Sequence, residues 1–248
     1  MQVEYYKEYS NFLKHDMEFK VYGHKGLPCL AFACEGGRFY DWEDNGMISA
    51  LSPFIENGQI QVFTADSVDD ESWLGDNHDL RYRAEAQERW FNYIVNELVP
   101  RIQEISGGSG KILSMGTSLG GGHAVNVYLR RPALFCGAIG LSGSYLPSTW
   151  FETGEEDDLI LRNSPIHILR SKTNADIKKY SGPLWVCCGQ GPYESSFLVE
   201  SKKFAEVGKL CKLNHNFELW SDKCSHDWYW WQKQIAIFVP RCLDALVK

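Results

Sequence analysis

The sequence predicts a three-layer α/β fold, in which helices cover both faces of a mostly parallel central sheet. Two observations carry this prediction. Short apolar runs alternate with longer helical segments along the chain, as they do in open α/β sheets. The apolar runs are also nearly continuous instead of alternating with polar residues, as expected of parallel strands that are buried on both faces.

We expect one domain over residues 1–248, because this length suits a single large domain and no repeat or linker divides the chain. One region fits the pattern poorly. The segment Leu146–Lys179 carries the acidic run GEEDD and few periodic signals. We therefore expect an insertion near residues 146–179, placed over one end of the sheet.

Five apolar runs are predicted to form the buried strands. They are CLAFAC (Cys29–Cys34), IQVFTA (Ile60–Ala65), KILSM (Lys111–Met115), CGAIGLS (Cys136–Ser142) and LWVCC (Leu184–Cys188). The N-terminal segments VEYYKEY and MEFKVYG alternate more regularly, which predicts an antiparallel hairpin at one edge of the sheet.

Helices are predicted between these strands. Apolar residues recur every four positions at Trp90, Ile94, Leu98 and Ile102, and Pro100 is expected to kink or end that helix. Further helical segments run over Ser118–Arg130, over Ser195–Leu210, and from near His226 toward the C-terminus.

The composition limits the partners and the compartment. The net charge of −7 argues against nucleic acid and anionic membranes, since both need a basic surface. No apolar run has membrane-spanning length, and the N-terminus lacks the basic and apolar regions of a signal peptide. The eight cysteines are scattered without a CxxC pair, so we expect reduced thiols in the cytoplasm, no metal site and no cofactor. A homo-oligomer stays possible.

The stretch KILSMGTSLGGGHAVNVYLRRP predicts a nucleophile. An apolar strand leads into Gly116-Thr117-Ser118-Leu119-Gly120, and a helix follows. In a nucleophile elbow the serine sits on such a strand-to-helix turn, and its glycines let backbone segments approach closely. The alternative is a glycine-rich helix cap with Ser118 as the N-cap residue. The similar runs GGSGK and GLSGS lack the register or the following helix that would make them a phosphate loop or a second elbow.

A serine nucleophile needs a histidine base, and in this fold class the chain order is serine, acid, histidine. Four histidines follow Ser118. His123 lies on the helix after the elbow and is expected to point away, while His167 and His215 lie in β-like runs. His226 lies in a polar turn between a predicted strand and the last helix, where a loop at the C-terminal edge of the sheet is expected. It is the predicted base.

The acid is expected on a loop after an earlier strand at the same edge. Glu194 is the first carboxylate after LWVCC, on the Gly/Pro-rich loop GQGPYESSF, and is the predicted acid. Asp222 is the rival, although it lies only four residues before His226.

An oxyanion hole needs two backbone N–H donors. One is expected at Leu119, directly after the nucleophile. The other is expected from Gly37 or Arg38 in the loop CEGGRFYDW, where two glycines permit close approach. In the same loop, the side chains of Phe39, Tyr40 and Trp42 could line a sugar-binding site, or they could simply pack at the rim.

Four of these segments in this order resemble the putative-esterase family of α/β-hydrolases, which includes esterase D, feruloyl esterases and mycolyltransferases. They are CEGGRFYDWEDNGM, GTSLGG, LWVCCGQGPYESSFL and SHDWYWWQKQI, and the resemblance runs roughly from Pro28 to Phe238. It implies an α/β-hydrolase fold and places the acid at Glu194, where some members carry Asp. The region Leu146–Lys179 has no clear match, so the substrate does not transfer with the fold.

These features together predict a serine carboxylesterase that hydrolyses small acyl esters through an acyl-enzyme, with Ser118, His226 and Glu194 as its triad. An acyltransferase that uses an alcohol or sugar acceptor is the first alternative. A non-catalytic ligand-binding protein with the same fold is the second.

Overall fold

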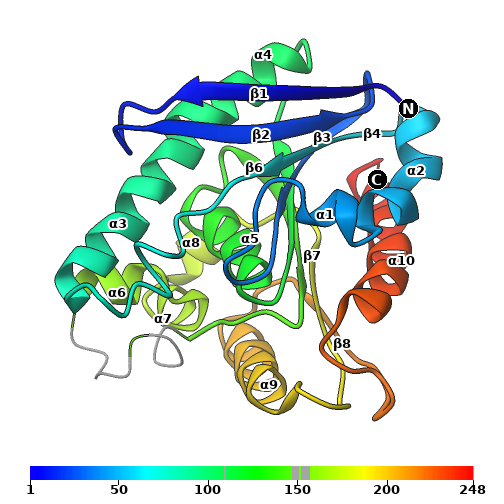
Figure 1. The fold of residues 1–248 in the computed structure, drawn as a ribbon. Coiled ribbons are helices and arrows are strands. Elements are labelled where there is room, and N and C mark those ends of the chain that lie inside the picture. Colours follow the sequence, from blue (N-terminus) through cyan, green and yellow to red (C-terminus); the bar gives the residue numbers. More distant parts are fainter. Residues whose placement is uncertain (109, 147–150, 152–156, 248) are drawn as a thin grey trace.

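The computed structural model describes residues 1–108, 110–146, 151 and 157–247. Its centre is one sheet of eight strands in the order β1-β2-β4-β3-β5-β6-β7-β8 (Figure 1). The pairs β1–β2 and β2–β4 are antiparallel, and every later pair is parallel. The strands are β1 (Val3–Tyr9), β2 (Asp16–Tyr22), β3 (Leu27–Phe32), β4 (Ile60–Ala65), β5 (Ile112–Thr117), β6 (Phe135–Leu141), β7 (Leu184–Cys188) and β8 (Asn216–Leu219).

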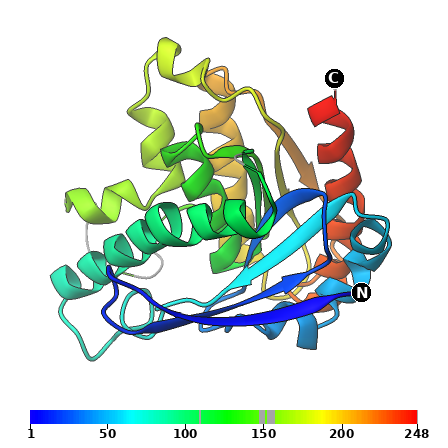
Figure 2. The ribbon, with the colours of Figure 1, turned by 90° about the horizontal axis from the view of Figure 1, so that it is seen from above.

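Helices cover the sheet on both faces, and the sheet separates two hydrophobic cores (Figure 2). One face carries α3 (Leu80–Tyr93), a π-helical turn η1 (Ile94–Leu98), α4 (Val99–Ile105), α5 (Leu119–Arg130), α6 (Asp158–Arg162), α7 (Pro165–Arg170), α8 (Asn174–Ile177) and α9 (Ser195–Leu210). The other face carries α1 (Asp41–Asp44), α2 (Met47–Glu56) and α10 (Trp228–Val247). None of the helices within the described residues is long and apolar enough to cross a membrane.

The predicted strands are confirmed to within two residues at each end. Two of them, Ile60–Ala65 and Leu184–Cys188, have the predicted bounds, and the predicted hairpin is β1–β2 at the sheet edge. All six residues of β4 and of β5 are buried, in keeping with their continuous apolar character.

The apolar stripe from Trp90 to Ile102 is also confirmed, since all four residues are buried. The expected break at Pro100 takes another form. The chain stays helical, passes through the π-helical turn η1 at Ile94–Leu98, and places Pro100 in the first turn of α4. Proline lacks the N–H that would bond to a carbonyl of the preceding turn, and the π-helical turn η1 directly before it accommodates this break in the bonding pattern.

The β-like interpretation of the run around His167 is wrong, because this run forms the helix α7. Ser164 caps the helix by accepting from the His167 N–H, and Pro165 follows at the first helical position. These local start signals outweigh the β-branched character of Ile166 and Ile168. In the segment expected to be an insertion, residues 147–150 and 152–156 lie outside the described residues, and the remainder contains α6, α7 and α8.

Candidate active site

Ser118 lies on a strained turn between β5 and α5. Its φ of 54° is rare for a residue other than glycine. A side chain at Gly116 would meet the carbonyl oxygen of Gly120 at 2.0 Å, and a side chain at Gly120 would meet that of Ala33 at 2.0 Å. Both glycines are therefore required by the close approach of strand, turn and helix, as in a nucleophile elbow. Ser118 occupies the N-cap position but makes no side-chain cap.

The hydroxyl of Ser118 instead meets the imidazole of His226. Ser118 Oγ and His226 Nε2 are 2.9 Å apart, across 108 residues of sequence. His226 lies in the turn between β8 and α10, and its backbone N–H donates to the carbonyl oxygen of Pro192 at 3.0 Å. This bond ties the histidine turn to the loop that carries Glu194.

The carboxylate of Glu194 lies on the opposite side of the imidazole. Its Oε2 is 3.0 Å from His226 Nδ1, and its Oε1 accepts from Ser142 Oγ at 2.6 Å and from the Gly189 N–H at 3.2 Å. Burial opposes ionisation of this side chain, which is 1% exposed, but the hydrogen bonds from His226 and Ser142 outweigh it and lower the pKa of Glu194. An ionised Glu194 fixes the proton of the neutral imidazole on Nδ1, which leaves Nε2 free to accept the Ser118 proton.

Two aromatic rings hold the imidazole in place. Phe197 stacks on it at a centroid distance of 4.0 Å and an angle of 19°, and Trp231 meets it edge-on at 4.8 Å and 86°. The indole N–H of Trp231 donates to Ser142 Oγ at 3.2 Å. Ser142 therefore links the final helix to Glu194, and neither Ser142 nor Phe197 was predicted as part of the site.

Several residues that the sequence made candidates lie elsewhere. Asp222 is exposed, and no hydrogen bond joins it to His226 in the described part of the chain. His123 is buried among Phe32, Trp73 and Trp90, so it belongs to the packing behind the elbow. His215 packs edge-on against Phe204 of α9, with ring centroids 6.3 Å apart.

The loop after β3 closes on itself in a tight turn. The Gly37 N–H donates to the carbonyl oxygen of Cys34 at 3.0 Å, so this amide is used within the turn. The Arg38 side chain turns outward to Asp66 at 2.6 Å and Glu18 at 2.8 Å. A side chain at Gly37 would lie 2.5 Å from the Cβ of Ala33, which borders the elbow.

The three aromatic residues of this loop differ in exposure. Trp42 is 1% exposed, belongs to the core between the sheet and α10, and donates its indole N–H to the carbonyl oxygen of Phe32 at 3.1 Å. Phe39 is also buried, whereas Tyr40 is exposed. Trp42 is therefore a packing residue of the core. Of the three rings, Tyr40 is the one that is exposed to solvent.

We expect Trp231→Ala to destabilise the fold by about 3–5 kcal/mol, because a buried aromatic side chain is lost. Turnover should fall as well, since the imidazole and Ser142 lose a neighbour. Tyr229→Ala is the matched control: it removes an exposed ring two residues earlier on α10 and should change stability by less than about 0.5 kcal/mol. Chemical denaturation and kcat measured together test this. A loss of activity in Trp231→Ala without a loss of stability would make the aromatic run a substrate wall.

The sheet order, the strained serine turn and the histidine at the C-terminal edge define a protein of the α/β-hydrolase class. The family model described as Putative esterase matches residues 10–241, and the chain belongs to this family. It is accordingly an enzyme, an esterase-type hydrolase.

Solved structures with the same fold show how far the likeness extends. A ferulic acid esterase has a TM-score of 0.77 at 14% identity, with 98% of each chain covered. The S-formylglutathione hydrolase of Staphylococcus aureus has a TM-score of 0.73 at 13% identity, covering 98% of this chain and 100% of that one. MPT51 (FbpC1) of Mycobacterium tuberculosis has a TM-score of 0.76 at 13% identity, with 99% of each covered. No curated protein matches the sequence.

Proposed function

We propose that this esterase-type hydrolase is a serine carboxylesterase whose triad is Ser118, His226 and Glu194. The observation that carries the proposal is the hydrogen-bonded series from Ser118 Oγ through the imidazole to the buried Glu194 carboxylate. A serine, a base and a buried acid in this arrangement are the parts that acyl transfer requires. The substrate is a small acyl ester, and no metal or cofactor takes part.

In the acylation step Ser118 Oγ attacks the ester carbonyl carbon while His226 Nε2 takes the hydroxyl proton. The tetrahedral intermediate then expels the alcohol, which receives that proton from Nε2, and the acyl group stays on Ser118. In deacylation a water molecule attacks the same carbon, His226 takes its proton, and the collapse returns the proton to Ser118 Oγ and releases the acid. Glu194 stays ionised throughout and stabilises the imidazolium.

The oxyanion of each intermediate needs two backbone donors. We propose Leu119, whose N–H belongs to the first turn of α5 and has no intrahelical acceptor, as the first donor. The loop after β3 supplies the second. Because the Gly37 amide closes the turn onto Cys34, the Arg38 amide is the better candidate of the two.

We expect Gly37→Val to lower kcat by roughly 10²-fold or more, the scale of losing one oxyanion donor. The added side chain would clash with Ala33 and with the Cys34 carbonyl oxygen at 2.8 Å, and would displace the loop. Gly110→Val is the matched control, because nothing lies within 4 Å of a side chain there. A change in KM alone would show that the loop binds substrate and does not stabilise the oxyanion.

An acyl-enzyme predicts a constant partition of the acyl group between water and an added alcohol. Acetyl esters with different leaving groups should give the same ratio of acetic acid to acetylated alcohol, because all pass through acetyl-Ser118. A ratio that depends on the leaving group would contradict the mechanism. If the acetylated alcohol is the main product even at low alcohol concentration, the protein is better described as an acyltransferase. If no ester is turned over, it is better described as a ligand-binding protein.

The cysteines bear on the cellular compartment of the protein. All eight cysteines are free thiols, and five of them are buried. We propose a cytoplasmic location, where such thiols stay reduced.

A further inference from the structure

A cavity lies at the end of α5 that is remote from Ser118. It has a volume of about 710 Å³ and is lined by the C-terminal end of α5, by α6, and by α7 with the two residues that follow it. The 12 residues of α5 separate it from the elbow by about 18 Å at the usual rise of an α-helix. The cavity is therefore distinct from the candidate active site.

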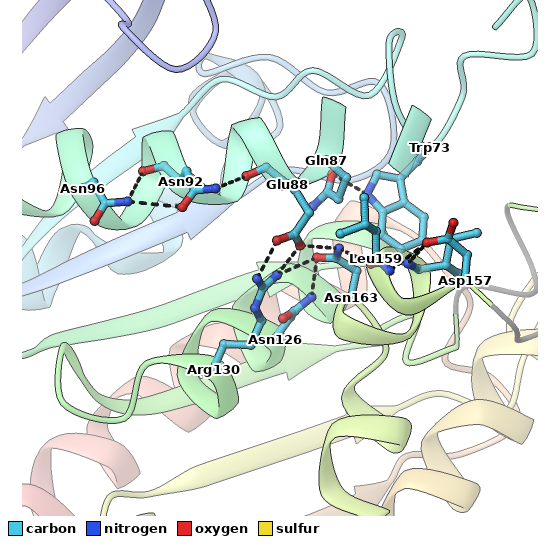
Figure 3. Close-up of polar contacts among 11 residues, drawn as sticks. Trp73, Gln87, Glu88, Asn92, Asn96, Asn126, Arg130, Asp157, Leu159 and Asn163 are labelled. Atoms are coloured by element: carbon cyan, nitrogen blue, oxygen red, sulfur yellow. Dashed lines mark hydrogen bonds and ion pairs between the residues drawn. The ribbon is translucent and has the colours of Figure 1, made fainter. Parts of the chain in front are cut away.

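One of the residues that line this cavity, Arg130, is an ion-paired arginine. Arg130 makes two hydrogen bonds to the carboxylate of Glu88 at 2.7 and 2.9 Å (Figure 3). Asn163 joins the pair: it accepts from Arg130 at 3.1 Å and donates to Glu88 at 2.8 Å. These bonds hold α3, α5 and the turn after α6 together, and they compensate the charge of Arg130.

The walls of the cavity carry four further cations. They are Arg131, Arg162, Arg170 and Lys172. Within the described residues none of the four makes an ion pair, and the one carboxylate that lines the cavity is Asp158.

The charged groups around the cavity shift the pKa of Arg130. Burial lowers the pKa of Arg130, Glu88 opposes this, and the positive charges of Arg131 and Arg162 lower the pKa further. Such a concentration of positive charge stands out in a chain whose net charge is −7.

Helix ends explain part of this arrangement. Arg162 and Arg170 lie in the last turns of α6 and α7, and Arg131 follows α5, where carbonyl groups favour a cation. That effect accounts for a cation at the end of each helix taken alone. It does not account for four cations around a shared cavity, where they repel one another unless an anion lies between them.

We propose that this cavity binds a small polyanion, a phosphorylated metabolite with at least two negative charges. Guanidinium groups match phosphate oxygens with paired N–H donors, and three of these four cations, which have no ion pair within the described residues, are arginines. The volume lies within the range of small-molecule sites, and Leu161 and Ile168 provide an apolar wall for the organic part. The site does not depend on the proposed esterase mechanism.

Inorganic pyrophosphate is the probe that tests this site. We expect calorimetric titration at constant ionic strength to give a Kd of about 1 mM or lower for the wild type, and an affinity at least about tenfold weaker for Arg162→Gln/Arg170→Gln. Lys202→Gln/Lys203→Gln is the matched control, since it removes the same charge from α9, outside the cavity, and should bind as the wild type does. Ser118→Ala should also bind normally, which separates this site from the active site.

The proposal is overturned if pyrophosphate produces neither heat nor a shift in melting temperature, because the cations would then serve only their helix ends. It is equally overturned if the control variant weakens binding as much as the cavity variant does, since net charge alone would explain the effect. If Arg162→Gln/Arg170→Gln fails to fold, Arg131→Gln/Lys172→Gln provides the same comparison without altering the last turns of α6 and α7.

Discussion

Ser118→Ala is expected to reduce hydrolysis of p-nitrophenyl acetate to background, a loss on the order of 10⁴-fold or more. The variant removes the one protein atom that bonds to the acyl group in the proposed mechanism. The fold should survive, because alanine fits the space and the loss of one hydrogen bond to His226 costs about 1 kcal/mol. Its melting temperature should therefore fall by no more than about 4 °C.

The matched control for this variant is Ser52→Ala on α2, where the hydroxyl donates to the carbonyl oxygen of Ser49 and to no other group in the described part of the chain. It should keep full activity. Retained hydrolysis by Ser118→Ala, purified free of wild-type enzyme, would mean that another group is the nucleophile, and the strained turn at Ser118 would need a different explanation.

Glu194→Gln is expected to lower kcat about 10³–10⁴-fold, by comparison with the aspartate-to-asparagine change in a serine protease triad. The amide nitrogen would face the Nδ1–H of His226, so the imidazole would turn or change tautomer and Nε2 would no longer accept the Ser118 proton. Asp222→Asn should cost less than about tenfold, because Asp222 is exposed and away from His226. The opposite order of the two variants would reassign the acid.

Glu194→Gln should also change how the stability of the fold depends on pH. The pKa of Glu194 is lower in the folded protein than its ordinary value. The carboxylate therefore stabilises the fold above the ordinary pKa, and this contribution is lost as pH falls through the folded pKa. The melting temperatures of wild type and Glu194→Gln should converge at acid pH, and a constant difference would show that Glu194 is not ionised in the folded protein.

Local sequence signals were enough to predict the strands and the nucleophile elbow. The turn at Ser118 needs glycines at fixed positions between an apolar strand and a helix, and these are visible in the chain itself. The positions of Glu194 and His226 followed from the rule that loops after parallel strands meet at one edge of the sheet. That rule places backbone segments, and the structure brings the three side chains within hydrogen-bond distance.

Side-chain environments were the part that the sequence did not reveal. In the sequence Ser142 ends a predicted strand and lies in a run that resembles a second elbow, and its contact with Glu194 spans 52 residues. Trp42 and Tyr40 lie two residues apart, yet one is buried and the other is exposed, because Tyr40 is the N-cap of the short helix α1 and Trp42 lies within that helix. The helix α7 was hidden because its β-branched residues favour a strand when the capping signal before them is ignored.

The central claim is that Ser118 is the group that becomes acylated, and covalent labelling tests it most directly. Wild-type protein treated with a fluorophosphonate should gain the mass of one phosphonyl group, and peptide mass spectrometry should locate it on Ser118. Glu194→Gln should be labelled much more slowly, because its imidazole no longer activates the hydroxyl. A label on any other residue, or no label under conditions that inactivate the enzyme, would contradict the account.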